Sequence, residues 1–238
     1  MTIEFWWRDD DASIPDPALR RLFDLAERSQ VPLALAAIPA LAESAAFEAM
    51  PAQVSLLQHG VDHRNRAAVG GKKSEFAEGE PVDAAMARLA AGRAHLETVA
   101  GARVLPVLAP PWNRIHAALE ARLCEAGYAG ISTFGVRNVT NPPSGLKQVN
   151  THVDIIDWKG GRGFVGEESA LLQATRHLVA KRTGAADALE PTGWLTHHAV
   201  HDSASWEFLE RLFEWTAGIA GVHWRSPARV FGHMEQSG

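Results

Sequence analysis

The chain has 238 residues, 46% of them hydrophobic, and a formal net charge of −5. This size and apolar content fit a single domain over residues 1–238 with a sizeable core. The mild acidity argues against a nucleic-acid partner, which would need a basic face. A single cysteine excludes an internal disulfide framework, and no apolar run approaches the ~20 residues of a membrane span. No secretory signal is evident, so the expected location is the cytoplasm; the oligomeric state stays open.

Apolar runs of strand length alternate along the chain with segments of helical periodicity. The predicted strands cover residues 3–8, 31–38, 54–58, 104–108, 130–134, 152–158, 193–198 and 222–224. The predicted helices cover residues 18–29, 41–50, 82–99, 115–126, 167–182 and 204–217, with a last helix from 226. We expect a mobile loop over the polar residues 66–81 and irregular structure over 135–151.

This alternation predicts a parallel sheet. At roughly 30 residues per strand–helix unit, about seven units use up the chain. The sequence therefore favours α/β architecture as one distorted (β/α)7-8 TIM-like barrel. In such a barrel the active site lies at the carboxyl ends of the strands. Five predicted strand ends carry unusual residues: Asp9 to Asp11, His59 with His63, Pro110 to Asn113, Asp157 with Trp158, and His197 with His198.

Five of the eight tryptophans fall beside predicted strand ends or loops. An indole offers a flat apolar face that suits a sugar ring, whereas the alternative is that these residues fill a large core. They are Trp6, Trp7, Trp112, Trp158 and Trp194.

Asp9, Asp10 and Asp11 directly follow an apolar strand. Three consecutive carboxylates repel one another unless a cation or a proton lies among them. The triplet is therefore a candidate metal or acid–base site. The alternative is a solvated turn, since Asp is common in turns and at helix N-caps.

His59 and His63 are four residues apart, and Gly60 between them gives the backbone freedom to turn. In a tight turn this spacing aims both imidazoles at one point. Two imidazoles and one carboxylate make a three-ligand site for a divalent ion, with one position left open for water. The histidine pair is weak evidence alone and gains weight from the acidic triplet.

Taken together, these motifs resemble those of a known family. Asp9-Asp10, His59-x-x-x-His63, Pro110-Pro111-Trp112, Asp157-Trp158 and Leu195-Thr196-His197 are similar, in order and spacing, to the five motifs of polysaccharide deacetylases, carbohydrate esterase family 4. The resemblance runs from residue 9 to residue 202. It implies a distorted (β/α) barrel and metal-dependent removal of an N- or O-acetyl group from a sugar.

The resemblance also implies a metal site and a base. Asp10, His59 and His63 would bind the divalent ion, and Asp9 would take the proton of the attacking water. Zinc is the expected ion, with cobalt, nickel, manganese or iron as alternatives.

The remaining roles follow from the later motifs of the same resemblance. The backbone N–H of Trp112 would stabilise the oxyanion. His197 would be the general acid, and Asp157 would orient it. His198 competes with His197, because only one of two neighbours on a strand can face the barrel mouth.

Four residues depart from the family pattern. The arginine that usually opens the third motif is absent, and Arg8 or Arg114 at the same rim is expected to supply its charge to Asp9. We expect Asp11 to orient a metal ligand without binding the ion itself, or to form a plain turn. We expect Asn113 to support the site in the same indirect way. The departing residues are Arg8, Asp11, Gly60 and Ala109.

The leading functional hypothesis is a metal-dependent deacetylase acting on an acetylated sugar or small saccharide. The second is a metal-dependent amidohydrolase with a non-sugar substrate on the same barrel. The third, from a different class, is a degenerate barrel that binds carbohydrate without turnover, which the alanine at position 109 favours.

Overall fold

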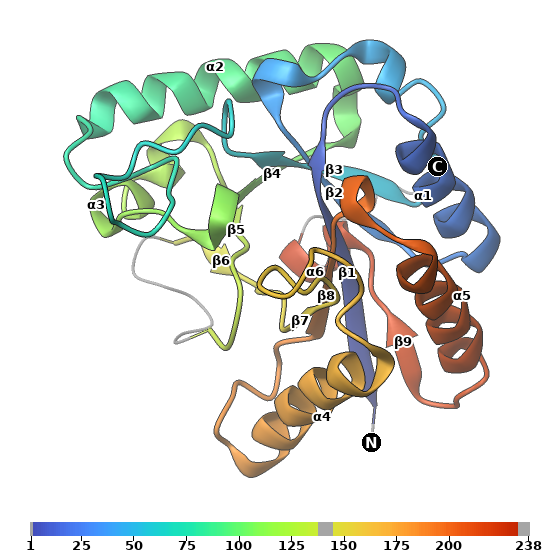
Figure 1. The fold of residues 1–238 in the computed structure, drawn as a ribbon. Coiled ribbons are helices and arrows are strands. Elements are labelled where there is room, and N and C mark those ends of the chain that lie inside the picture. The colour runs from blue at the N-terminus through green and yellow to red at the C-terminus, as the bar shows by residue number, and fades with distance from the viewer. Residues whose placement is uncertain (1, 138–144, 233–238) are drawn as a thin grey trace.

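The computed structural model describes residues 2–137 and 145–232. Nine parallel strands form a strongly curled sheet, and helices cover its outer side (Figure 1). The strands are β1 (Ile3–Ala12), β2 (Leu33–Ala37), β3 (Val54–His59), β4 (Val104–Ala109), β5 (Gly130–Ile131), β6 (Lys147–Gln148), β7 (Val153–Asp154), β8 (Thr192–Thr196) and β9 (Val222–Trp224). The helices are α1 (Pro17–Ser29), α2 (Val82–Ala100), α3 (Ala117–Glu120), α4 (Glu167–Thr183), α5 (Ser203–Ala217) and α6 (Pro227–Phe231).

The strand order is β6-β5-β4-β3-β2-β1-β8-β7, and β9 pairs with the start of β1. The predicted alternation and the distorted TIM-like barrel are confirmed. Because β1 lies between β2 and β8 in this order, its carboxyl end lies between theirs. The acidic triplet does not follow this strand but forms part of it, since β1 continues to Ala12.

A short segment closes the barrel between β5 and β8. The Thr151 N–H donates to Thr133 O (3.0 Å), so residues 147–151 continue along β5. The next residue, His152, donates to Gly193 O (2.7 Å), and the chain then pairs with β8. One continuous stretch of backbone therefore joins the two sides of the sheet.

Several predicted elements are shorter in the structure. The helix predicted over 41–50 is wrong: that region holds two 3-10 turns, Pro39–Leu41 and Ser44–Ala46. The helix predicted over 115–126 is divided into α3 and a 3-10 turn at Leu123–Ala126. Within the irregular stretch 135–151, β6 was missed, and residues 138–144 lie outside the described part.

The strand predicted over 152–158 ends at Asp154 for a local reason. The Asp154 carboxylate accepts the Ile156 N–H (3.0 Å), and this side-chain turn competes with continued strand pairing. The loop predicted over 66–81 is anchored rather than mobile along part of its length, because Ser74, Glu75 and Phe76 are buried.

Three of the five tryptophans near predicted strand ends lie in the hydrophobic core. Trp6, Trp7 and Trp194 are buried, so for these three the core interpretation is confirmed. Trp158 is 43% exposed, and Trp112 is partly buried. No helix in residues 2–137 and 145–232 is long and apolar enough to cross a membrane.

Candidate metal centre and active site

Asp11, His59 and His63 converge at the carboxyl ends of β1 and β3. The Asp11 Oδ1 atom lies 3.2 Å from His59 Nε2 and 3.3 Å from His63 Nε2. Ligand atoms about 2.0–2.2 Å from a tetrahedral zinc ion lie roughly 3.3–3.5 Å from one another, so this spacing fits a bound ion. Oδ1 is buried and has no hydrogen-bond partner among the described residues, so the two imidazole nitrogens and a shared ion would account for it. The three side chains form one of the two groups in the described chain that could hold a metal.

Hydrogen bonding prepares His59 for this role. Its Nδ1 lies 2.9 Å from Ala109 O, a carbonyl that can only accept, so Nδ1 carries a proton and, in the neutral ring, Nε2 is the nitrogen with the free lone pair. Burial lowers the pKa of His63, and the neighbouring His59 lowers it further. Burial alone would raise the pKa of Asp11, but His59 and the imidazoles around it lower it. A carboxylate and at least one neutral imidazole are therefore present at neutral pH.

The β1 backbone decides which aspartate reaches this group. Side chains of a strand alternate between its two faces, so Asp9 and Asp10 point in opposite directions. Asp11 breaks the alternation: its φ is 75°, and the pairing register with β2 shifts between Asp9 and Ala12. This irregularity turns the Asp11 carboxylate toward the histidines of β3.

Asp10 lies beside this group but is held by Arg8. The Arg8 Nε is 2.9 Å from Asp10 Oδ1, and Nη2 is 3.0 Å from Oδ2. The fully buried guanidinium also donates to Ser132 O and Oγ (3.0 and 2.7 Å) and to Asn113 Oδ1 (2.8 Å). The expectation that Asp10 is the metal ligand therefore does not fit the geometry, in which Asp11 occupies that position.

Asp9 faces away from the mouth. Its fully buried carboxylate accepts Thr196 Oγ1–H (2.6 Å) and the His198 N–H (3.0 Å), and it forms an ion pair with the His198 ring. This burial and these three contacts leave it badly placed to take a proton from water. The role of base expected for Asp9 does not fit this position. Neither Arg8 nor Arg114 bonds Asp9: Arg8 pairs with Asp10, and Arg114 Nη1 donates to Lys73 O (2.8 Å).

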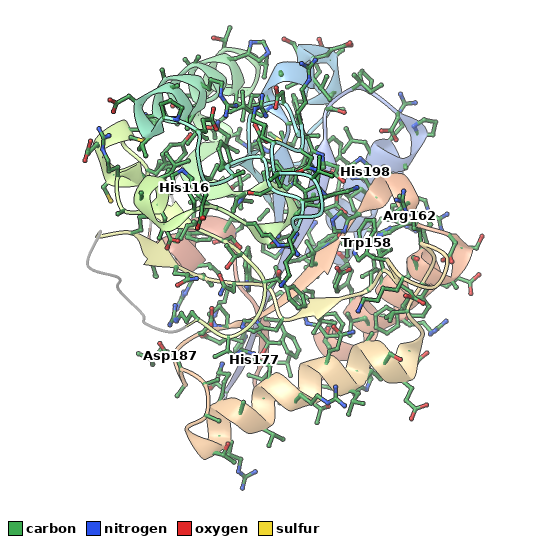
Figure 2. The ribbon with its side chains drawn as sticks, turned by 60° about the vertical axis from the view of Figure 1, so that its left-hand side comes forward. His116, Trp158, Arg162, His177, Asp187 and His198 are labelled. Carbon is green, nitrogen blue, oxygen red and sulfur yellow. The ribbon has the colours of Figure 1, made fainter. Side chains whose placement is uncertain are left out.

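His197 faces the mouth, as expected, while His198 faces Asp9. The His197 Nε2 atom is 4.0 Å from Asp10 Oδ2, and its Nδ1 is buried without a hydrogen-bond partner among the described residues. Its ring packs edge-on against Trp158, with ring centroids 4.7 Å apart. The Trp158 Nε1–H in turn donates to Asp154 Oδ2 (2.8 Å). Figure 2 shows Trp158 and His198 in the same region of the molecule.

Asp154, rather than Asp157, is linked to His197, through the Trp158 side chain that contacts both. Burial raises the pKa of Asp154, and the electrostatic attraction of His197 opposes that rise. The Asp157 Oδ1 atom instead accepts the N–H groups of Lys159 and Gly160 (3.1 and 2.8 Å), which forms a local turn. The orienting role expected for Asp157 is thus at odds with the structure.

Trp112 and Asn113 adopt left-handed backbone conformations, with φ of 54° and 55°. Pro110 and Pro111 precede them and fix the approach of the chain. The Trp112 ring packs against His63 at a centroid distance of 4.5 Å. Asn113 supports the site by accepting from Arg8. The use of the Trp112 N–H as an oxyanion donor stays a prediction.

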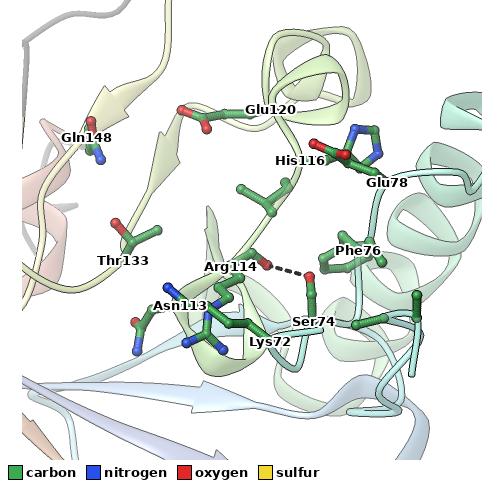
Figure 3. A pocket seen from close by; sticks show the side chains of 14 residues that line it. Lys72, Ser74, Phe76, Glu78, Asn113, Arg114, His116, Glu120, Thr133 and Gln148 are labelled. Atoms are coloured by element: carbon green, nitrogen blue, oxygen red, sulfur yellow. Dashed lines mark hydrogen bonds between the residues drawn. The ribbon is translucent and has the colours of Figure 1, made fainter. Parts of the chain in front are cut away.

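A cavity of about 800 Å³ adjoins the centre and shares Asn113 with it. Figure 3 shows Ser74 and Phe76 on one side, opposite Thr133 and Gln148, with a hydrogen bond from Ser74 Oγ to Arg114 O (3.4 Å). Nine of its fourteen lining residues are polar or charged, so the cavity offers hydrogen-bonding groups to a hydroxyl-rich ligand.

The second group of potential ligands is His152, His177 and Glu190, all buried. The two imidazoles stack face to face, with centroids 3.4 Å apart and planes 12° apart. A ligand nitrogen donates within its ring plane, and one ion cannot lie in two nearly parallel planes at that separation. Arg137 lies beside Glu190 as well, at 3.9 Å. The geometry therefore favours a core cluster, which lies away from His198 in Figure 2.

No protein-family model matches the sequence, and no curated protein matches it either. Solved structures do match. A Mycobacterium smegmatis protein assigned as a polysaccharide deacetylase is 16% identical with a TM-score of 0.67, over 97% of this chain and 89% of that one. A family 4 acetyl xylan esterase from Clostridium thermocellum, in complex with a cobalt ion, is 12% identical with a TM-score of 0.59, over 96% and 90%.

A third similar structure is a family 4 pseudoenzyme from Bacillus anthracis. It is 13% identical with a TM-score of 0.57, over 90% of this chain and 60% of that one. The fold of the chain is therefore that of the family 4 polysaccharide deacetylases, as the motif resemblance implied. Fold likeness at these identities does not decide between an active and an inactive barrel, so that question rests on the site residues.

Sequence reasoning missed two residues of this region. Asp154 lies three residues before Asp157, and the tryptophan that follows Asp157 drew attention to the wrong carboxylate. Glu75 lies in a Gly/Lys/Glu-rich stretch that reads as solvated, yet it is fully buried. An isolated glutamate in such a segment carries no local signal of burial.

Proposed function

We propose that the protein is a metal-dependent deacetylase that hydrolyses the acetyl group of an N- or O-acetylated sugar or small saccharide. One observation carries the proposal: the Asp11, His59 and His63 cluster lies beside an arginine-held Asp10, with His197 across from it. The fold it shares with deacetylases of saccharides supports the substrate class.

Asp11, His59 and His63 would hold the ion, and zinc suits a set of two imidazoles and one carboxylate. A divalent ion bound there would polarise the acyl carbonyl and lower the pKa of water. Asp10 would then accept the proton of the attacking water as general base. The bound Arg8 contacts both carboxylate oxygens of Asp10 and so orients that carboxylate.

His197 would protonate the leaving nitrogen or oxygen, so that the amine or alcohol departs neutral. Its Nε2 lies on the Asp10 side of the mouth, and its ring packs against Trp158, which donates to Asp154. The Trp112 N–H would donate to the oxyanion of the tetrahedral intermediate. Asp9 has no chemical step in this scheme. With His198, it fixes the backbone that carries His197.

An acetate-release assay tests the proposal. The chain, stripped with a chelator and reloaded with zinc, is incubated with acetylated monosaccharides, acetylated oligosaccharides and non-sugar acetamides. We expect acetate release from at least one saccharide, dependent on zinc and lost in Asp11→Ala. Activity on the acetamides alone would favour the amidohydrolase alternative.

The third hypothesis, a binding barrel without turnover, drew its support from Ala109. Arg8 weakens that support, since it supplies a guanidinium to Asp10 from a different position in the sequence. Saccharide binding without acetate release from any compound, in the zinc-loaded chain, would nevertheless favour it.

A further inference from the structure

The turn that carries His63 has an unusual backbone. Gly60 has a φ of 59° and His63 a φ of 54°, so two of five consecutive residues lie in the left-handed region. A non-glycine residue in that region is strained and persists only where its surroundings hold it. Something must therefore fix this turn if His63 is to face Asp11.

Glu75 is the group that holds it. One carboxylate oxygen accepts the N–H groups of Val61 and Asp62 (2.9 and 3.1 Å), and the other accepts the N–H of His63 (3.2 Å). Three consecutive amides thus converge on one buried carboxylate. Such convergent N–H groups make a concave site for an anion.

Burial and the charge of Asp62 raise the pKa of Glu75, the backbone N–H groups oppose that rise, and two arginines lie close to the carboxylate. Arg88 Nη1 lies 3.4 Å and Arg66 Nη1 3.8 Å from its Oε1 atom. Both arginines have other partners, since Arg66 bonds Asp62 (2.8 and 2.7 Å) and Arg88 bonds Glu80 (2.7 and 2.9 Å). Removing the charge of Glu75 therefore leaves neither guanidinium unpaired.

Gly60 makes room for this arrangement. A Cβ atom built on Gly60 would lie 2.1 Å from Glu75 Oε2. Any side chain at position 60 would push the carboxylate out of its contacts. This accounts for the glycine at position 60, one of the four residues that depart from the family pattern.

The neighbours of Glu75 tie the same segment to the cavity wall. Ser74 and Phe76 line the cavity (Figure 3), and the His116 N–H donates to Phe76 O (3.2 Å). The Ser74 N–H donates to Asn65 Oδ1 (3.0 Å). Glu75 thus joins a segment of the cavity wall to the turn that carries a ligand.

We propose that Glu75 is a positioning residue. It does not bind the ion itself, but it holds the His59–His63 turn in the conformation that places His63 for metal binding. The inference rests on the proposed function, because it requires that His63 binds an ion. Partners that orient a ligand from behind it are worth about 10- to 100-fold in metal affinity.

The test is the zinc affinity of the full-length chain, measured by competition with a chromogenic chelator. Glu75→Gln keeps the shape of the side chain but places an amide NH₂ among N–H donors. We expect its zinc Kd to rise about 10- to 100-fold. Glu80→Gln is the matched control, since it removes a charge from the same Arg88 without contacting the turn; its Kd should match wild type.

A positioning role also predicts rescue by excess metal. The kcat of Glu75→Gln should recover at saturating zinc, whereas simple misfolding would not be reversed. A wild-type Kd in a folded Glu75→Gln, or an equal loss in Glu80→Gln, would overturn the inference. If wild type itself binds no zinc, the proposed function fails, and this inference with it.

Hydrogen exchange gives a test that needs no variant. In metal-free wild type, the amides of residues 61–63 should be protected because each donates to a buried carboxylate. Exchange as fast as that of exposed loops would rule out a preset turn. This result is informative even if Glu75→Gln does not fold.

Discussion

Arg8 and Asp10, two residues apart on one face of β1, form a two-point ion pair in which the guanidinium is fully buried. The family pattern takes its arginine from the third motif, but here the charge comes from the strand that also carries the carboxylate. The pair and the metal cluster therefore share one strand, and β1 alone supplies three of the proposed active groups: Arg8, Asp10 and Asp11.

We expect Asp10→Asn to lower kcat by about 10²- to 10⁴-fold, the usual contribution of a general base. Zinc should stay bound, because Asp10 is outside the ligand group. Acetate release and metal analysis on the same preparation check both parts. A mutant that keeps full turnover would remove Asp10 as the base.

Asp11→Ala removes one of three ligands and should reduce bound zinc well below the roughly one ion per chain of a single site. Asp10→Ala should retain the ion. Metal content after dialysis against a weak chelator distinguishes the two. The reverse result, with metal lost only in Asp10→Ala, would restore the original assignment from sequence.

Asp9→Ala should act on stability. Removing one partner of a buried ion pair leaves the other uncompensated, at a cost of about 3–5 kcal/mol in the free energy of unfolding. Urea unfolding of the metal-free protein measures it. Asp157→Ala, in a local turn, is the control and should cost about 1 kcal/mol or less. An Asp9→Ala chain as stable as this control would contradict the assignment.

His177 makes stability depend on pH. Burial, with the nearby His152, Lys181 and Arg137, lowers the pKa of His177 to about 3. In the unfolded chain His177 takes up a proton near pH 6.5, whereas in the folded chain it stays neutral down to about pH 3. The folded state is therefore fully stabilised above pH 6.5 and loses free energy of unfolding as the pH falls toward 3. The loss is at most about 1.4 kcal/mol per pH unit.

Between pH 7 and pH 5, His177→Gln should therefore lose less stability than wild type, by about 1–2 kcal/mol. Urea unfolding at the two pH values measures the difference, and His223→Gln, at an exposed position, is the control. Identical pH dependence in His177→Gln and wild type would contradict a neutral buried imidazole.

The barrel could be predicted from the sequence because its strands are strongly patterned. β2, for example, is a run of five buried apolar residues, as a strand covered on both faces requires. The helix expected over 41–50 failed because tertiary contacts override propensity there: the Glu43 N–H, for instance, donates to Ser13 O (3.1 Å).

The composition of the site could be predicted, but the positions of its carboxylates could not. His59, His63 and His197 face the mouth as expected. Asp9, Asp10 and Asp11 are identical in type, and their roles depend on strand alternation and on the backbone irregularity at Asp11. Neither periodicity nor residue type encodes that irregularity, so the roles expected for Asp9 and Asp10 were displaced by one residue.

The segment that passes from β5 to β8 has a consequence for the width of the mouth. Ser132, which holds Arg8, follows β5, while His197 follows β8. Between these two strands the connection is covalent, because Thr151 pairs on one side and His152 on the other. The distance across the mouth from Ser132 to His197 is thus limited by backbone length, whereas Asp10 and His197 are carried by directly paired strands. Inserting one residue at this junction should move Ser132 away from Arg8 while leaving the proposed base, acid and metal ligands in register.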